Sequence, residues 1–218
     1  MKIIVNGIQL NYEVMGYGKP LILLHGNQEN YHIFECIKDR LAQKYELHLI
    51  DSRNHGNSDF TDDYSFLSMT HDIKSYIEKM KISPVYFYGF SDGGIIGLML
   101  ASMYPNMVSK LMVSGVNVNP LGLKKNLMKK IISSYQKNKS PYLKMMMEEP
   151  NIKDKDLKSI QIPVLLTLGE YDLITRSHTK HILSNLKNGK LHIYQGLDHG
   201  NHLLGNQNFI NDLFNFFD

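Results

Sequence analysis

The chain of 218 residues contains a single cysteine, Cys36. One cysteine excludes an intramolecular disulfide and a zinc site made of cysteines, so we expect Cys36 to be a small buried hydrophobic residue on a helix. The sequence also lacks any run of the roughly 18 apolar residues that a membrane-spanning helix needs. The N-terminal segment Met1–Gly7 has too few apolar side chains for a signal peptide. These absences predict a cytoplasmic protein without stable membrane insertion.

A strong charge of either sign is missing too. The 24 Lys and Arg residues nearly balance the 21 Asp and Glu residues, and the formal net charge is +3. A pI near 8.7 therefore does not predict nucleic-acid binding. The hydrophobic content of 43% is ordinary for a globular protein, and 218 residues suffice for one domain with a substantial core. We expect a single domain over residues 1–218, of unknown oligomeric state.

Apolar runs alternate along the chain with amphipathic stretches. The runs predict strands at 2–5, 8–14, 21–24, 46–50, 85–88, 110–114, 163–169 and 190–194. Apolar residues at helical spacing predict helices at 31–43, 66–80, 95–103, 124–135, 142–148, 177–187 and 207–217. This alternation indicates the α/β class, with a mostly parallel sheet and helices on both faces. Asn6 and Gly7 form a turn signal, which predicts an antiparallel N-terminal hairpin at one edge of the sheet.

The pentapeptide Gly89-Phe90-Ser91-Asp92-Gly93 joins a predicted strand to a predicted helix. A G-x-S-x-G pattern in this context puts the serine at the apex of a sharp, strained turn. The glycines leave room where a Cβ would clash, and the N–H group of Asp92 lies at a helix N-terminus that favours an oxyanion. Ser91 is therefore a candidate nucleophile, although a glycine-rich loop that only turns the chain gives the same pattern.

A serine nucleophile needs a histidine that takes its proton and an acid that orients the histidine. Loops at the carboxyl ends of parallel strands gather at one edge of a sheet, and two later loops of this kind contain Asp172 and His199. Serine, acid and histidine then follow in the order that accompanies such a turn. Two rivals lie close by. Asp198 adjoins the histidine, and we expect His202 to begin the last helix or to line the rim of the site.

Five motifs at strand ends, in this order, make nearly the whole chain resemble an α/β-hydrolase. They are His25-Gly26, Asp51-x-Arg53-x-His55-Gly56-x-Ser58-Asp59, Gly89-Phe90-Ser91-Asp92-Gly93-Gly94, Gly169-Glu170-Tyr171-Asp172 and Gly196-Leu197-Asp198-His199. The resemblance implies an α/β-hydrolase fold with Ser91 as nucleophile, Asp172 as acid and His199 as base. It also implies an oxyanion hole made by the backbone N–H groups of Asn27 and Asp92, and neither a metal nor another cofactor.

The remaining polar residues of these motifs have structural interpretations. We expect His25 to make hydrogen bonds near the oxyanion loop, and the side chain of Asp92 to cap its helix. Arg53, His55 and Asp59 are expected to brace their loop through hydrogen bonds and an internal ion pair.

In the family that the chain resembles, the segment after the strand that follows the nucleophile is a cap that covers the site and sets specificity. Here this segment is short, about residues 116–160. Its Met145 and Met146 are candidates for lining an adaptable acyl pocket, or else they pack a small helical cap onto the body. The lysines at 124, 125, 129 and 130 form a basic face. A solvated helix surface is the default interpretation, and attraction of an anionic substrate or a membrane surface is the alternative.

The resemblance implies a serine hydrolase that cleaves a small-molecule ester or a related acyl compound through an acyl-enzyme. The same three side chains would serve a thioesterase, a C–C hydrolase, a lyase or a perhydrolase, because the cap and not the triad selects the substrate. A non-catalytic ligand receptor of the same fold is a further alternative. The expected partner is a small-molecule acyl substrate and not a nucleic acid.

Overall fold

The computed structural model describes residues 1–218 and contains one eight-stranded sheet. The strands are β1 (Lys2–Val5), β2 (Ile8–Met15), β3 (Lys19–Leu24), β4 (Tyr45–Ile50), β5 (Val85–Phe90), β6 (Val108–Ser114), β7 (Val164–Gly169) and β8 (Gly189–Tyr194). The α-helices are α1 (Glu35–Leu41), α2 (Phe66–Met80), α3 (Asp92–Met103), α4 (Lys125–Asn138), α5 (Pro141–Glu148), α6 (Asp154–Ser159), α7 (Arg176–Asn185) and α8 (Gln207–Phe217). Short 3-10 helices are η1 (Tyr31–Phe34), η2 (Pro120–Gly122) and η3 (Asn201–Leu203).

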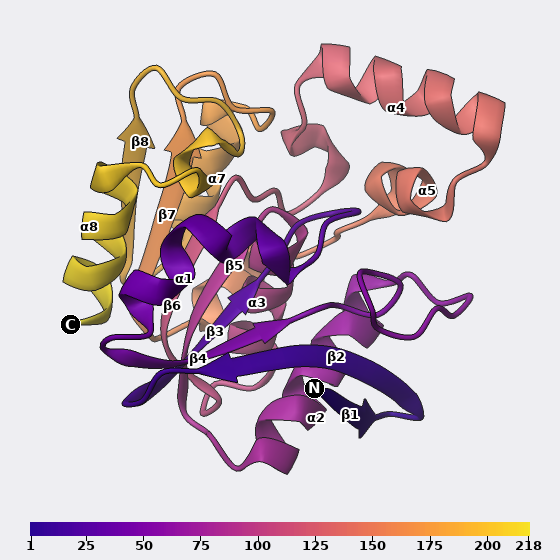
Figure 1. The fold of residues 1–218 in the computed structure, drawn as a ribbon. Helices are drawn as coiled ribbons and strands as arrows, with labels where there is room; N and C mark the ends of the chain where they lie inside the picture. The colour runs from indigo at the N-terminus through magenta and orange to yellow at the C-terminus, as the bar shows by residue number, and fades with distance from the viewer.

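The strands are ordered β1-β2-β4-β3-β5-β6-β7-β8 across the sheet (Figure 1). The pairs β1–β2 and β2–β4 are antiparallel, and every other pair is parallel. The predicted α/β architecture and its N-terminal hairpin at one edge are therefore confirmed. Asn6 and Gly7 turn this hairpin with φ angles of 47° and 80°, the left-handed values that a two-residue hairpin turn requires.

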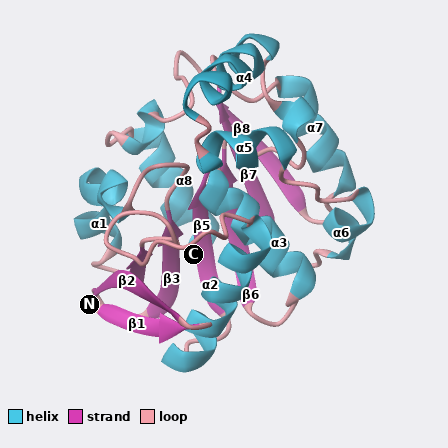
Figure 2. Ribbon diagram, turned by 90° about the vertical axis from the view of Figure 1, so that its right-hand side faces the viewer, coloured by secondary structure: helices cyan, strands magenta, loops and turns pink.

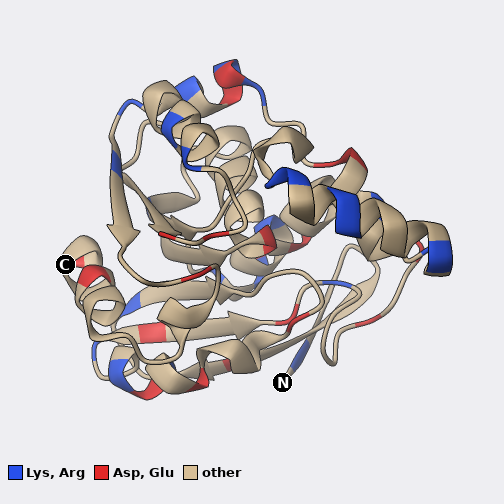
Figure 3. Ribbon diagram, turned by 90° about the horizontal axis from the view of Figure 1, so that it is seen from above, with Lys and Arg blue, Asp and Glu red and all other residues tan.

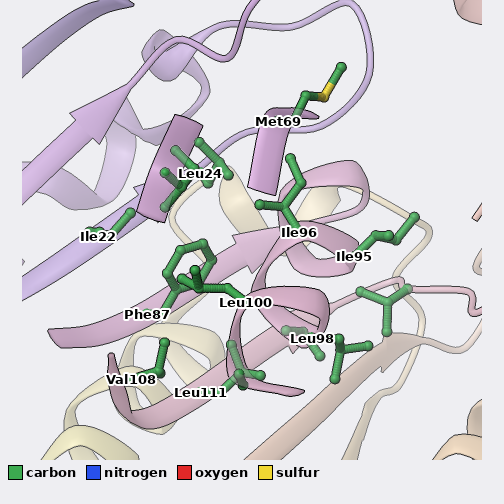
Figure 4. Packing of buried hydrophobic residues seen from close by; sticks show 14 of the residues in the cluster. Ile22, Leu24, Met69, Phe87, Ile95, Ile96, Leu98, Leu100, Val108 and Leu111 are labelled. Carbon is green, nitrogen blue, oxygen red and sulfur yellow. The ribbon is translucent and has the colours of Figure 1, made fainter. Parts of the chain in front are cut away.

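Helices cover both faces of the sheet (Figure 2). Along β3, Ile22 and Leu24 point into a cluster of 31 buried residues shared with α2, α3, α6 and α7, whereas Leu21 and Leu23 point into a cluster of 18 shared with α1 and α8. Figure 4 shows the larger cluster around α3 and the strands beneath it. Because both faces of the strand are covered, its sequence is continuously apolar, which is why the run was recognisable.

The exposure of Cys36 differs from the prediction. Cys36 lies on α1 as expected, but it is exposed and not buried. The helix buries Ile37 and Leu41, which are four residues apart and share one face. Cys36 is one residue out of phase with that face, about 100° around the helix, so its thiol points to solvent.

None of the helices is both long enough and apolar enough to cross a bilayer.

The loop after β4 is fixed by a buried ion pair. The Arg53 guanidinium donates from Nε to Asp72 Oδ2 at 2.6 Å and from Nη2 to Asp72 Oδ1 at 2.8 Å. His55 Nδ1 lies 2.8 Å from the Arg53 carbonyl oxygen, and Asp59 accepts from the Gln9 N–H group at 2.8 Å. The expected bracing by hydrogen bonds and an ion pair is confirmed, with α2 supplying the carboxylate.

We expect the substitution Arg53→Met to lower the free energy of unfolding by about 3–5 kcal/mol, because it leaves the buried Asp72 carboxylate without a positive charge beside it and with only the Asn6 amide as a side-chain donor. Urea denaturation measures this loss. Lys74→Met is the matched control, since Lys74 forms an ion pair with Glu78 on the same helix at 31% and 47% side-chain exposure. An exposed pair contributes about 0.5 kcal/mol. Equal losses in the two variants would contradict the prediction.

Candidate active site

Ser91 lies between the end of β5 and the start of α3, with φ 50° and ψ −115°. A non-glycine residue in this conformation is strained by about 1–3 kcal/mol. The neighbouring backbone holds it there: the Ser91 N–H group donates to the Ser114 carbonyl oxygen at 2.8 Å, and the Ser91 carbonyl oxygen accepts from the N–H groups of Gly94 and Ile95. The sharp turn expected from the pentapeptide is confirmed.

The two glycines of the turn are required by close backbone contacts. A Cβ at Gly89 would lie 2.3 Å from the Gly93 carbonyl oxygen, and a Cβ at Gly93 would lie 2.2 Å from the Leu24 carbonyl oxygen. Both distances are far below van der Waals contact. The end of strand β5 can therefore lie against helix α3 because Gly89 has no side chain, and the start of α3 can lie against the end of strand β3 because Gly93 has none.

The structure brings Ser91, His199 and Asp172 together at the carboxyl edge of the sheet. His199 Nε2 lies 3.1 Å from Ser91 Oγ, and His199 Nδ1 lies 2.7 Å from Asp172 Oδ1. A carboxylate only accepts hydrogen bonds, so the proton of the neutral imidazole is on Nδ1, and Nε2 is free to accept from the serine hydroxyl. This is the geometry in which a histidine can act as a general base towards a serine.

Asp172 is 1% exposed, yet its carboxylate is well supplied with donors. Oδ1 accepts from the Ile174 N–H group at 2.9 Å and Oδ2 accepts from the Gly169 N–H group at 3.2 Å. Burial disfavours the ionised form, but the hydrogen bond and charge of His199 and these two N–H groups outweigh it and lower the pKa of Asp172 below its usual value. Asp172 is therefore ionised at neutral pH.

Asn27 and Asp92, the predicted oxyanion-hole residues, lie beside each other. The Asn27 side-chain amide donates from Nδ2 to Asp92 Oδ2 at 2.9 Å. The backbone N–H groups of both residues have no acceptor within the protein. The expectation that the Asp92 side chain caps α3 is wrong, because its carboxylate is buried and bound to Asn27 instead.

Glu29 is a site residue that the sequence reasoning missed. Its Oε2 accepts from the Gly26 N–H group at 2.9 Å, and its own N–H group donates to the Gly26 carbonyl oxygen, which closes the turn that presents Asn27. Burial raises the pKa of Glu29, and burial together with the Glu29 charge raises the pKa of Asp92 to about 6. The sequence feature that could have indicated Glu29 is an acidic residue three positions after Gly26 of the His25-Gly26 motif.

Ser91 opens into a small cavity of about 40 Å³ and an outer cleft of about 370 Å³. Apolar side chains dominate the walls of the cavity and include Phe66, Ile95, Leu123, Leu127, Met146 and Leu173. The linings contain the neutral His199 and three acids, Glu29, Asp92 and Glu149, but no Lys or Arg. The space next to the serine is therefore apolar with a negative edge.

Helices α4 and α5 form one wall of this cavity and stand out from the body in Figure 1. Met146 lines the cavity as expected. Met145 does not: it is buried in the large core cluster, because successive residues on a helix point about 100° apart. The four lysines of the expected basic face of α4 are exposed and form no salt bridge, which agrees with a solvated surface (Figure 3).

The rival residues take other positions. Asp198 is exposed and its carboxylate accepts from the N–H groups of Gly200 and Asn201, so it shapes the loop. His202 was expected to begin the last helix or to line the rim, and both expectations are wrong. It lies in η3 and is 1% exposed. His25 bonds to the Gly26 carbonyl oxygen and accepts from the Ser52 N–H group, as expected of a structural residue. No cluster of three or more His, Cys, Asp or Glu side chains could hold a metal ion.

The sequence and the fold are similar to those of known proteins. A family model described as "alpha/beta hydrolase fold" matches residues 19–138. The chain belongs to the α/β-hydrolase fold family. Among the relatives of this α/β-hydrolase, serine hydrolase BPHL of Mus musculus is 26% identical over 238 residues, which cover 93% of this chain and 80% of that protein. The sn-1-specific diacylglycerol lipase ABHD11 of Danio rerio is 31% identical over 120 residues, or 52% of this chain and 37% of that protein.

Solved structures give the same fold for this α/β-hydrolase. The meta-cleavage product hydrolase of Pseudomonas fluorescens IP01 superposes with a TM-score of 0.84 at 19% identity, over 100% of this chain and 97% of that one. Est816, described as an N-acyl homoserine lactone degrading enzyme, superposes with a TM-score of 0.83 at 21% identity, over 99% and 100% of the two chains. At these identities the likeness extends to the fold alone.

Proposed function

We propose that this α/β-hydrolase is a serine hydrolase that cleaves a small neutral ester or a related acyl compound through an acyl-enzyme. The observation that carries the proposal is the continuous set of hydrogen bonds from Ser91 Oγ through His199 to Asp172, beside two backbone N–H groups without acceptors. These are a nucleophile, a base, an orienting acid and an oxyanion hole within one site. The relatives named serine hydrolase and lipase support the same class.

In the proposed reaction Ser91 Oγ attacks the carbonyl carbon of the substrate while His199 Nε2 takes the hydroxyl proton. The carbonyl oxygen becomes an oxyanion, which accepts hydrogen bonds from the N–H groups of Asn27 and Asp92. Asp172 stabilises the imidazolium that forms. The imidazolium then gives its proton to the leaving oxygen as the tetrahedral intermediate collapses, and an acyl-serine and an alcohol result.

Deacylation repeats these steps with water as the nucleophile. His199 takes a proton from the water, the oxyanion forms again in the same position, and the histidine returns the proton to Ser91 Oγ as the acid product leaves. Each oxyanion-hole donor contributes roughly 3–4 kcal/mol to such a transition state. The bond between the Asn27 side chain and Asp92 keeps the two proposed donors together.

We further propose that residues 1–218 form a single domain in which about 116–160 is the cap. Leu127 of α4 and Met146 of α5 lie in the wall of the cavity, and this supports a role of the segment in substrate choice. The same triad would also hydrolyse a thioester, so an oxygen ester and a thioester of one acyl group belong in the same assay.

Turnover of p-nitrophenyl esters of increasing chain length tests the proposed function. We expect hydrolysis of short and medium acyl chains, and loss of hydrolysis after treatment with a serine-reactive fluorophosphonate. A protein that binds these compounds, with a raised melting temperature but without turnover, would instead be a receptor and would refute the proposal.

The acidic edge of the cavity predicts a preference for uncharged acyl groups. We expect kcat/KM to be about 10–100-fold lower for the mono-p-nitrophenyl ester of adipic acid than for p-nitrophenyl hexanoate, because the terminal carboxylate must lose its water against apolar and acidic walls. Glu149→Gln removes one of the acids in the wall and should narrow this ratio. Equal turnover of the two esters by the wild-type enzyme would contradict the prediction.

A further inference from the structure

Four buried polar side chains from four elements meet close to the proposed triad. Tyr88 of β5 donates from its hydroxyl to Ser114 Oγ of β6 at 2.9 Å, and Ser114 Oγ lies 2.5 Å from Thr167 Oγ1 of β7. His202 of η3 reaches the same group, with Nε2 3.3 Å from the Tyr88 oxygen. We call these four residues the buried polar chain. The triad mechanism described above uses none of them.

The directions of these hydrogen bonds are fixed by counting protons. Thr167 donates to the Val113 carbonyl oxygen at 3.4 Å, so the proton between Thr167 and Ser114 comes from Ser114. The Tyr88 hydroxyl proton is used on Ser114, and therefore Nε2 of His202 must carry a proton to bond to the Tyr88 oxygen. Every hydroxyl in the chain thus donates once and accepts once, and His202 is the Nε2–H tautomer at its head.

Three of the four elements in the buried polar chain lie next to a triad residue in the sequence, and the fourth, β6, bonds to the backbone of Ser91. Strand β5 leads directly into Ser91, and the Ser114 carbonyl oxygen accepts from the Ser91 N–H group. Strand β7 leads into the loop that contains Asp172. His202 follows His199 in the same loop. The buried polar chain therefore connects, beneath the site, the three segments that carry Ser91, Asp172 and His199.

Aromatic rings surround His202. They connect it to His199 and provide an apolar environment that disfavours a charged ring. The Phe90 ring packs against both histidines, with its centroid 4.9 Å from that of His199 and 5.7 Å from that of His202. Tyr194 and Phe209 enclose the other sides, with centroids 5.7 Å and 4.8 Å away. Nδ1 of His202 has no hydrogen-bond partner.

Burial lowers the pKa of His202 to about 4. The charged and titratable groups that act on it are Asp172 and Asp198, which favour the protonated form, and His199, which disfavours it. Tyr88 and Tyr194 are neutral neighbours, since burial raises the pKa of both. The unpartnered Nδ1 agrees with a neutral ring, because a charged imidazolium would carry a buried proton on Nδ1 with no acceptor.

We propose that His202 is a positioning residue for His199: its Nε2–H group, bonded to Tyr88, anchors the loop that places the His199 imidazole between Ser91 and Asp172. This inference rests on the proposed function. It assigns to His202 neither contact with substrate nor proton transfer.

Kinetics of two variants test this role. His202→Phe keeps an aromatic ring but removes the donor, and we expect kcat for a p-nitrophenyl ester to fall about tenfold or more, with KM within about twofold, because a small displacement of a catalytic group is costly. His202→Gln restores an amide N–H group near the position of Nε2 and should recover most of kcat. Tyr88→Phe removes the acceptor and should act like His202→Phe, and the double variant should be little worse than either single one.

A second buried histidine provides a matched control. His48 is also fully buried and bonds through Nδ1 to the Tyr76 hydroxyl at 2.7 Å, but it lies on β4 away from the cavity linings. His48→Phe should lower the melting temperature about as much as His202→Phe and leave kcat unchanged. If the two variants lose kcat equally, or if His202→Phe keeps the wild-type kcat, the positioning role is refuted.

Nitrogen-15 NMR of histidine-labelled protein gives a test that is independent of turnover. We expect His202 to be the neutral Nε2–H tautomer at pH 6, with Nδ1 unprotonated, and we expect the same tautomer in Ser91→Ala. An Nδ1–H tautomer would overturn the inference even if every His202 variant failed to fold. Different results would refute the two proposals. A wild-type protein without esterase activity would refute the proposed function. An active enzyme whose kcat does not change when the Nε2–H donor of His202 is removed would refute only the positioning role.

Discussion

Replacing Ser91 by alanine is expected to lower kcat for p-nitrophenyl esters by at least about 10⁴-fold, because no acyl-enzyme can then form. Folding should survive the change. Alanine keeps the φ of 50° and the neighbouring backbone bonds, and only the hydroxyl at 3.1 Å from His199 is lost. We therefore expect the free energy of unfolding to stay within about 1 kcal/mol of the wild type.

Ser91→Gly separates catalysis from strain at the same position. Glycine adopts a positive φ without a Cβ penalty, so this variant should be about 1 kcal/mol more stable than Ser91→Ala while remaining equally inactive. Fluorophosphonate labelling followed by urea denaturation measures both effects. Ser75→Ala, which changes a hydroxyl outside the cavity linings, is the labelling control. Undiminished labelling of Ser91→Ala would show that another residue reacts and would remove Ser91 from the mechanism.

Local sequence was enough to predict the parts of the fold that depend on neighbouring residues. The turn at Ser91 needs two glycines at fixed spacing, and the clashes that a Cβ would make at Gly89 and Gly93 explain why that spacing is informative. The bounds of α2 and α8 were predicted as 66–80 and 207–217 and agree with the structure, because each has a clear apolar face. The short helix α6, Asp154–Ser159, was missed because it buries only Leu157 and so has no periodicity to detect.

Residues whose surroundings come from distant segments could not be placed in this way. His202 was expected to begin the last helix or to line the rim, yet Phe90 and Phe209, from two other elements, close around it. Met145 and Met146 are adjacent in sequence, and only the docking of α5 decides which of them reaches the cavity. Sequence indicates that such side chains are apolar or titratable, while long-range packing determines what they touch.

The acidic edge of the cavity shows the same limit in electrostatic terms. Glu29 and Asp92 are far apart in sequence, but the bond from Asn27 to Asp92 and the turn closed by Glu29 bring both acids to the serine. Burial raises the pKa of both acids, and the charge of Glu29 further raises that of Asp92; both effects appear only in the folded chain. Five motifs at strand ends could thus indicate the expected chemistry, while the polarity of the substrate site had to come from the structure.

Asp172→Asn is expected to lower kcat about 10⁴-fold at pH 7 with little change in overall structure, because the amide imposes the wrong histidine tautomer. The Asp172 oxygens accept from His199, Ile174 and Gly169. An asparagine oxygen at the Oδ2 position bonds to Gly169 and turns its NH₂ group towards His199. Nδ1 must then accept, Nε2 carries the proton, and the serine hydroxyl loses its base. Either orientation of the amide points its NH₂ group at a backbone N–H group, that of Ile174 in this orientation and that of Gly169 in the opposite one, so one of these buried hydrogen bonds is lost in both cases.

The same substitution has a pH-dependent effect on stability whose sign follows from the carboxylate. The pKa of Asp172 is lower in the folded protein than in the unfolded chain, so its ionised form stabilises the fold above the unfolded value of about 3.9. This contribution is lost as the pH falls through the folded pKa. Urea denaturation should therefore show Asp172→Asn clearly less stable than wild type at pH 7, with a difference that shrinks only as the pH falls below about 3.9. Asp198→Asn, an exposed neighbour, should change kcat by less than about threefold; a comparable loss there would mean that Asp172 is not the orienting acid.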